Sequence, residues 1–240
     1  MSTPRRFLNG ITNVAIDNPL GRLPYLDPTK WAIWFEDFLH YDIAQGDAAW
    51  ILDVVNAGAD AVVGPTGVLT LTLTGASDSI GLQQSNGVWQ LTAGKKAIFK
   101  TRCKIVKGGG TIGQEGFVIG LTSVQTTTNF MDAPPPTARA FDDGWCFASY
   151  DNTTDVIAMQ GEADTYSTEV GCTTYADDTW MTLAIYWDGY KSIFYKDDVE
   201  LCEITTNPPT SVISPVMFIS AGEAQTDALH VDYMFVAIER

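Results

Sequence analysis

The feature that most constrains the fold is a run near the end of the chain in which apolar and polar residues alternate. One side of an extended segment after Trp180 would carry Met181, Leu183, Ile185 and Trp187, and the other Thr182, Ala184 and Tyr186. Successive side chains of a strand point to opposite faces, so this period of two is typical of a strand with one buried face. Asp-Gly and Asp-Asp pairs follow at 188–189 and 197–198 and favour turns. The run therefore predicts antiparallel β structure.

The same pattern recurs from residue 31 to the end of the chain. We expect strands at Trp31–Phe38, Ala61–Val63, Val68–Thr74, Ser79–Gln84, Lys96–Val106, Glu115–Val124, Gly144–Tyr150, Val156–Gly161, Glu169–Thr173, Trp180–Trp187, Lys191–Tyr195, Val199–Ile204, Val216–Ser220 and Leu229–Ile238. The segment 47–54 is predicted to be mostly irregular or β, because its spacing is partly helical while its Trp, Ile and Val suit a strand. Many short strands between polar turns predict an all-β fold, a two-sheet antiparallel β-sandwich in one domain over 31–240.

Residues 1–30 differ from the rest of the chain. Asn-Pro, Leu-Pro and Asp-Pro pairs interrupt any regular element, yet the stretch is rich in apolar side chains, which a disordered tail would carry in small number. We expect an extended N-terminal docking arm that lies in a groove, either on its own domain or on a neighbouring subunit. Its predicted contact residues are Phe7, Leu8, Ile11, Leu20, Leu23 and Tyr25.

The charge of the chain limits its partners. A net charge of −15 and a pI near 4.3 argue against nucleic acid, because phosphate binding depends on clustered Lys and Arg. No apolar run reaches the ~18 residues of a membrane helix, and the first residues lack the apolar core of a secretory signal. We therefore expect no membrane partner and synthesis in the cytoplasm. Lys100, Arg102 and Lys104 fall on one side of their strand, and we expect this basic row on a solvated or edge-facing surface.

No metal or cofactor site is expected. Cys103, Cys146, Cys172 and Cys202 are far apart, form no Cys-x-x-Cys pair and have only two histidines to assist them. Buried, reduced thiols are the preferred interpretation, and a disulfide is the alternative. The acidic turns at 151–155 and 176–178 could supply oxygen ligands to calcium, but polar turns of an acidic protein have the same composition.

Several segments carry a resemblance to a known group of proteins. RFLNGITNVA (6–15) with NPLG (18–21), LPYLDPTK (23–30) and WFEDFLHY (34–41) resemble the start of structural proteins of tailed-phage virions, as do LTAGKKAIFKTR (91–102), DDTWMTLAIYWDG (177–189) and HVDYMFVAIER (230–240). In that group an N-terminal arm precedes a concanavalin A-like, laminin-G-like jelly roll. The resemblance implies a non-enzymatic capsid decoration or cement protein on the outer surface of the virion, bound to the major capsid protein and to its own copies as a homo-oligomer.

Two alternatives share that fold. Glycan hydrolases of this architecture need two carboxylates across the sugar, but the Glu-x-Asp-x-x-Glu string of the laminarinase-like family is absent. His40 and His230 do not accompany a nucleophile motif, so we expect no catalytic residue and no enzyme activity. A carbohydrate-binding module that takes a host glycan is the stronger alternative, since exposed Trp and Tyr rings stack on sugars. Trp50, Trp89 and Trp145 lie near element ends and are the rings best placed for such a platform.

Overall fold

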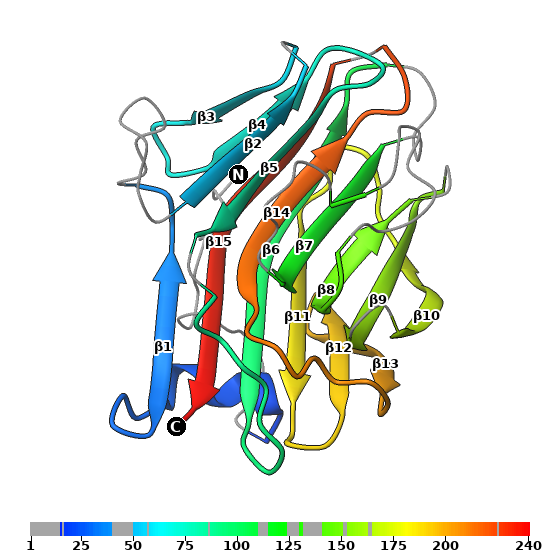
Figure 1. The fold of residues 1–240 in the computed structure, drawn as a ribbon. Helices are drawn as coiled ribbons and strands as arrows, with labels where there is room; N and C mark the ends of the chain where they lie inside the picture. Colours follow the sequence, from blue (N-terminus) through cyan, green and yellow to red (C-terminus); the bar gives the residue numbers. More distant parts are fainter. Residues whose placement is uncertain are drawn as a thin grey trace.

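The computed structural model describes residues 15, 17–39, 50–56, 58–85, 87–109, 115–123, 130–131, 141–150, 153–162, 165–224 and 226–240, and of residues 24–25 and 165–171 it describes the backbone alone. Two antiparallel sheets lie face to face, as predicted (Figure 1). A single 3₁₀ helix, η1 (Pro19–Tyr25), precedes the strands in the described part of the chain. None of the helical structure described is long and apolar enough to cross a bilayer.

The larger sheet has eight strands. Its order is β13 (Val199–Ile204), β12 (Ser192–Lys196), β11 (Met181–Trp187), β6 (Ala97–Lys107), β15 (Asp227–Glu239), β4 (Leu69–Leu73) and β3 (Asp60–Val63). The long β15 pairs with β4 through its first half and with β1 (Trp31–Glu36) through its second half. The larger sheet therefore places the start of β1 beside the end of β15.

The smaller sheet has seven strands. Its order is β10 (Thr165–Thr174), β9 (Asp155–Glu162), β8 (Gly144–Ser149), β7 (Gly116–Thr122), β14 (Ser214–Ser220), β5 (Ser79–Gln84) and β2 (Trp50–Val55). The segment whose structure the sequence left open thus forms the edge strand β2. Every other predicted strand is confirmed, and Ser79–Gln84 and Val199–Ile204 have the predicted bounds.

Apolar side chains fill the space between the sheets and also cover both outer faces. The central core contains the inward side of β11, namely Met181, Leu183, Ile185 and Trp187, as the alternation predicts. On the outer face of the smaller sheet, Phe130, Met131 and Phe141 pack on the central strands, and the rings of Phe130 and Phe218 are 5.4 Å apart. On the outer face of the larger sheet, η1 packs on β6, β11 and β15.

The strand that carries the basic row, β6, is not an edge strand of its sheet. β6 lies between β11 and β15, and the Lys100 side chain is only 2% exposed, so the prediction of an edge-facing or solvated row is wrong for this residue. Lys100 Nζ lies 2.8 Å from Asp198 Oδ1, and Arg102 Nη1 lies 3.0 Å from Asp232 Oδ2. Acidic side chains from the β12–β13 turn and from β15 thus neutralise charges that the sheet centre would otherwise leave buried.

Candidate functional site

A cleft of about 660 Å³ opens between η1 and the outer face of the larger sheet. It is lined by Asp17, Pro19, Arg22, Leu26, Trp31, Lys96, Ile98, Tyr186 and Glu239. Its size falls within the ~300–1,000 Å³ typical of small-molecule sites. The floor comes from the sheet, and one wall comes from the segment that precedes it in sequence.

Two buried leucines hold that wall in place. Leu20 and Leu23 are 0% and 3% exposed and pack in the outer-face cluster with residues of β6, β11 and β15. Asn18 caps η1, since its Oδ1 accepts a hydrogen bond from the Leu20 amide at 2.9 Å. A turn follows, in which the Trp31 amide donates to the Asp27 carbonyl at 3.0 Å and the chain enters β1. The fold of 17–31 thereby sets the position of Trp31 in the lining of the cleft.

Strand register brings the remaining cleft residues together. Trp31 lies opposite Glu239 in the β1–β15 pair, and Ile98 lies opposite Tyr186 in the β6–β11 pair. The Lys96 amide donates to Glu239 Oε2 at 3.1 Å, which orients this carboxylate at the end of the sheet. Trp31 and Tyr186 are both partly buried against the outer-face cluster, so each ring has a supported side and an accessible edge or face.

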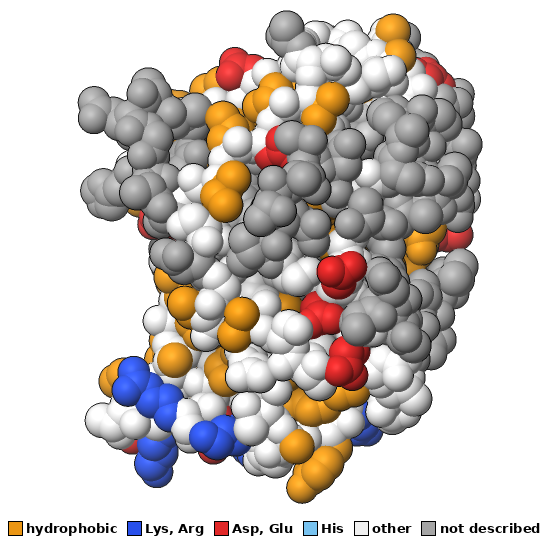
Figure 2. Space-filling view, in the orientation of Figure 1, with side chains coloured by type: hydrophobic (Ala, Val, Ile, Leu, Met, Phe, Trp, Pro, Cys, Tyr) orange, Lys and Arg blue, Asp and Glu red, His pale blue; other side chains and the backbone are white. Residues whose placement is uncertain are grey.

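The cleft offers both hydrogen-bond donors and acceptors. Arg22 and Lys96 carry donors, while Asp17 and Glu239 carry acceptors. Burial raises the pKa of Tyr186, the charge of Asp188 adds to the rise and Arg22 opposes it, so the phenol remains a donor at neutral pH. Although the chain is strongly acidic, Figure 2 shows blue Lys and Arg side chains gathered at one end of the molecule.

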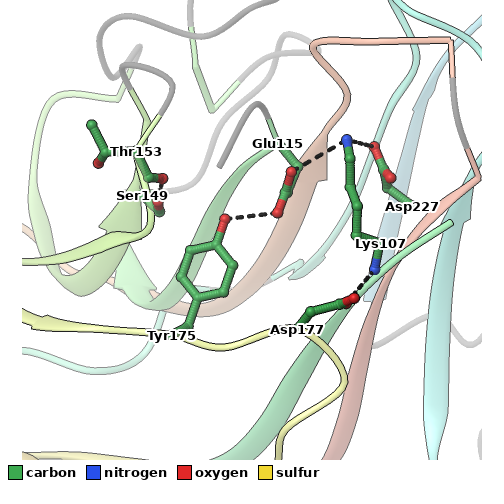
Figure 3. A network of polar contacts seen from close by, with 7 residues as sticks. All are labelled: Lys107, Glu115, Ser149, Thr153, Tyr175, Asp177 and Asp227. Atoms are coloured by element: carbon green, nitrogen blue, oxygen red, sulfur yellow. Dashed lines mark hydrogen bonds and ion pairs between the residues drawn. The ribbon is translucent and has the colours of Figure 1, made fainter. Parts of the chain in front are cut away.

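A second polar cluster lies inside the sandwich and is closed to ligands. Lys107 Nζ lies 3.1 Å from Asp227 Oδ2 and 3.4 Å from Glu115 Oε2, and the Tyr175 hydroxyl donates to Glu115 Oε1 at 2.7 Å (Figure 3). The side chains of Glu115 and Asp227 are 0% exposed. A sugar cannot reach these two carboxylates, so their role is structural. The Lys107 amide also donates to Asp177, one of the turn residues considered as a calcium ligand.

The arm residues and tryptophans predicted from the sequence as contact residues are not among the residues that line the cleft. Leu20 and Leu23 of the arm are buried within their own domain, so for these two the groove lies on the same chain. Phe7, Leu8 and Ile11 lie outside the described residues, as does the side chain of Tyr25. Trp50, Trp89 and Trp145 are 8%, 7% and 0% exposed, which excludes them as a sugar platform.

The structure places His230 and the four cysteines as follows. His230 is half-buried and its Nδ1 lies 2.9 Å from Thr70 Oγ1, while burial and Lys104 lower its pKa. His40 lies outside the described residues. All four cysteines are free thiols, and burial raises the pKa of Cys103 to about 12. Within the described ranges no group of three or more His, Cys, Asp or Glu side chains is arranged to hold a metal ion.

Sequence reasoning did not identify Trp31 and Tyr186 as site residues. The strand pattern assigns Trp31 to the core because it begins a strand. The sequence pattern that could have indicated Tyr186 is the alternation in β11, which places this residue with Thr182 and Ala184 on the outward side of the strand. An aromatic residue on the polar side of a strand presents apolar area on the outer face, and here the residues of η1 pack beside it in the outer-face cluster.

Comparison with solved structures identifies the fold. The carbohydrate recognition domain of Emp47p superposes with a TM-score of 0.59 at 12% identity, covering 88% of this chain and 98% of that domain. An endo-1,3-beta-glucanase from Streptomyces sioyaensis gives 0.56 at 13% identity, covering 89% and 98%. A structure described under endo-acting O-glycanases of the human gut microbiota gives 0.59 at 11% identity, covering 85% and 97%.

The chain is thus a concanavalin A-like jelly roll, a fold that serves both carbohydrate recognition domains and glycan-cleaving enzymes. No protein-family model matches the sequence. No curated protein is significantly similar to it. At these identities the superpositions establish the architecture, and the function has to be argued from the cleft.

Proposed function

We propose that this chain is a non-enzymatic, lectin-like carbohydrate-binding module whose ligand occupies the cleft beside η1. The observation that carries the proposal is the convergence of two partly exposed rings, Trp31 and Tyr186, with charged donors and acceptors in one cleft. Sugar rings present C–H faces that pack on aromatic surfaces, and their hydroxyls require partners of both kinds. The occurrence of carbohydrate recognition domains among proteins of this fold supports the same class of ligand.

The proposal predicts that Trp31→Ala and Tyr186→Ala each weaken glycan binding. Loss of one stacked ring corresponds to about 1–2 kcal/mol, or roughly a 5- to 30-fold rise in Kd. A glycan array identifies a ligand and calorimetry measures its Kd for each variant. Tyr190→Ala is the matched control, because Tyr190 is 75% exposed and does not line the cleft. Equal Kd values for all three variants would disprove the assignment of the cleft.

Catalysis is predicted to be absent even though the glucanase shares the fold. Asp17 and Glu239 are the carboxylates that line the cleft, and Glu239 Oε2 is already engaged by the Lys96 amide. We expect purified protein to release no reducing ends from β-1,3-glucan or mucin glycans. The opposite result would establish an enzyme instead: the wild type releases reducing ends, Glu239→Gln does not, and Glu203→Gln, which lies outside the cleft, still does.

A place on a phage particle remains a prediction that rests on the sequence resemblance alone. Neither the carbohydrate recognition domain, nor the glucanase, nor the O-glycanase structure is described as a virion protein. Binding of the purified chain to shells of a tailed phage, with the major capsid protein as partner, is the measurement that tests it. A glycan-binding module displayed on the virion surface would agree both with the sequence resemblance to virion proteins and with glycan binding in the cleft.

A further inference from the structure

The interior of the sandwich holds a lysine in contact with two carboxyl groups. Lys107 is the last residue of β6 and pairs with Asp227, the first residue of the adjacent strand β15. Its Nζ lies 3.1 Å from Asp227 Oδ2 and 3.4 Å from Glu115 Oε2 (Figure 3). The lysine side chain is 3% exposed and the two acidic side chains are 0% exposed. An amine, a carboxyl group and a second carboxyl group therefore meet away from water.

Neighbouring groups orient the members of this cluster. The Lys107 amide donates to Asp177 Oδ1 at 2.8 Å, which holds the backbone at the end of β6. The Tyr175 hydroxyl donates to Glu115 Oε1 at 2.7 Å, while Oε2 is the oxygen that contacts the lysine. Burial raises the pKa of Tyr175 and the charge of Glu115 adds to the rise, so the phenol stays a donor. The lysine and the two carboxyl groups are thus held at contact distance, as a reaction between them requires.

Burial favours the uncharged forms of the reacting groups. It raises the pKa of the Asp227 carboxyl, and Lys107 opposes the rise. An ammonium and a carboxylate are costly to hold without water, whereas an amide is neutral. Transfer of one proton from Lys107 to Asp227 gives an amine beside a carboxylic acid. A lysine amine in a desolvated site is a nucleophile, and the carboxylic acid is its electrophile.

We propose that Lys107 Nζ forms an amide bond with Asp227 Cγ, with Glu115 as the general base, so that β6 and β15 become covalently joined. The amine attacks Cγ, and the C–N bond forms as the carbonyl π bond opens. The Glu115 carboxylate accepts a proton from the nitrogen and passes it to the hydroxyl group of the former acid. The C–O bond then breaks, the carbonyl re-forms and one water molecule leaves. Atoms and charges balance, and no oxidant is consumed.

The second carboxylate distinguishes this cluster from another ion pair of β6. Lys100 Nζ lies 2.8 Å from Asp198 Oδ1, and the lysine side chain is 2% exposed. Within the described ranges Lys100 forms an ion pair with Asp198 alone, so this pair has no further carboxylate to carry the proton. We therefore expect an amide at Lys107 and none at Lys100. Chains that have not reacted keep the ion pairs of the structure and titrate as an ionic cluster.

Mass spectrometry of the full-length protein under reducing conditions tests the proposal. After several days at pH 7, the wild type should weigh one water molecule less than its sequence. Digestion should give a branched peptide that joins the segments around residues 107 and 227. This peptide map is required because Asp-Gly pairs, present at 143–144 and 188–189, also lose water when they cyclise. Residues 100 and 198 should be recovered in separate peptides, which is the internal control.

Two variants test the roles of the groups. Glu115→Gln keeps the size of the side chain without the base, and should form the link about 100-fold more slowly. Lys107→Arg keeps the positive charge but replaces the amine with a guanidinium, and should form no link. Circular dichroism establishes that each variant is folded, and the wild-type map remains decisive if one is not.

Two outcomes would overturn the proposal. Separate, unlinked peptides for residues 107 and 227 in the folded wild type would show that the amide does not form. An equal rate of linkage in folded Glu115→Gln would show that Glu115 is not the base.

Discussion

At the scale of single residues, Lys107, Glu115 and Asp227 form a buried cluster of charged side chains inside the sandwich. One lysine lies between two carboxylates that are fully removed from water. Each carboxylate would be strongly destabilising alone, because the interior cannot solvate it. For Glu115, the Tyr175 hydroxyl donates a hydrogen bond to Oε1, and the Lys107 ammonium forms an ion pair with Oε2 at 3.4 Å.

Lys107→Met should therefore be among the most destabilising changes in the chain. Removing the only cation of the cluster leaves two carboxylates facing each other, and we expect the free energy of unfolding to fall by about 3–5 kcal/mol. Urea denaturation at pH 7 measures the change. Lys95→Met serves as the control, since Lys95 is exposed and should change stability by less than about 0.5 kcal/mol. A similar small effect of both substitutions would contradict the structural role of the cluster.

The pH dependence of stability tests Asp227 in particular. Burial raises the pKa of its carboxyl above 3.8, and Lys107 opposes the rise only in part. The folded state therefore binds this proton more tightly than the unfolded state. The contribution of Asp227 to stability falls as pH rises from the unfolded pKa through the folded pKa, and is constant above it.

Asp227→Asn removes this titration. The stability of the variant minus that of the wild type should rise with pH through the same window and then level off. Denaturation curves from pH 3.5 to 8 give the difference, in which the titration of other groups cancels. A difference that falls as pH rises would contradict the raised pKa.

At the scale of elements, η1 shows which parts of the structure sequence could and could not predict. The strands were predictable because the signals that define each one, its local pattern and the turns that bound it, lie within its own segment, as in the alternation of 181–187. The cleft was not, because Asp17, Lys96 and Glu239 meet only once β6, β15 and the 3₁₀ turn have packed. Lys100 was misassigned for the same reason: its burial depends on Asp198, which is 98 residues away in sequence.

The packing of η1 leads to a prediction that connects stability with binding. Leu20→Ala removes a fully buried side chain and should lower the free energy of unfolding by about 2–5 kcal/mol. Because η1 forms one wall of the cleft, the same variant should bind glycan more weakly under conditions in which it is folded. Calorimetry and thermal denaturation measure both effects. Leu39→Ala is the control, since Leu39 is 53% exposed and does not line the cleft. If the folded Leu20→Ala protein bound glycan as tightly as the wild type, η1 would not contribute to the binding site.

At the scale of the whole molecule, the two outer faces of the sandwich have different properties. The outer face of the smaller sheet is covered at its centre by Phe130, Met131 and Phe141. The outer face of the larger sheet is only partly covered by η1, and the cleft opens beside it. Basic side chains gather at one end of a molecule whose net charge is −15. The fold alone is compatible with lectins and with hydrolases. The partly exposed rings of Trp31 and Tyr186 lie on the outer face of the larger sheet.

A crystal structure of the protein with the best ligand from a glycan array tests the central claim most directly. We expect a sugar ring packed on Trp31 or Tyr186, with hydroxyls that form hydrogen bonds with Arg22, Lys96, Asp17 or Glu239. A glycan bound instead on the outer face of the smaller sheet, with an empty cleft beside η1, would contradict it.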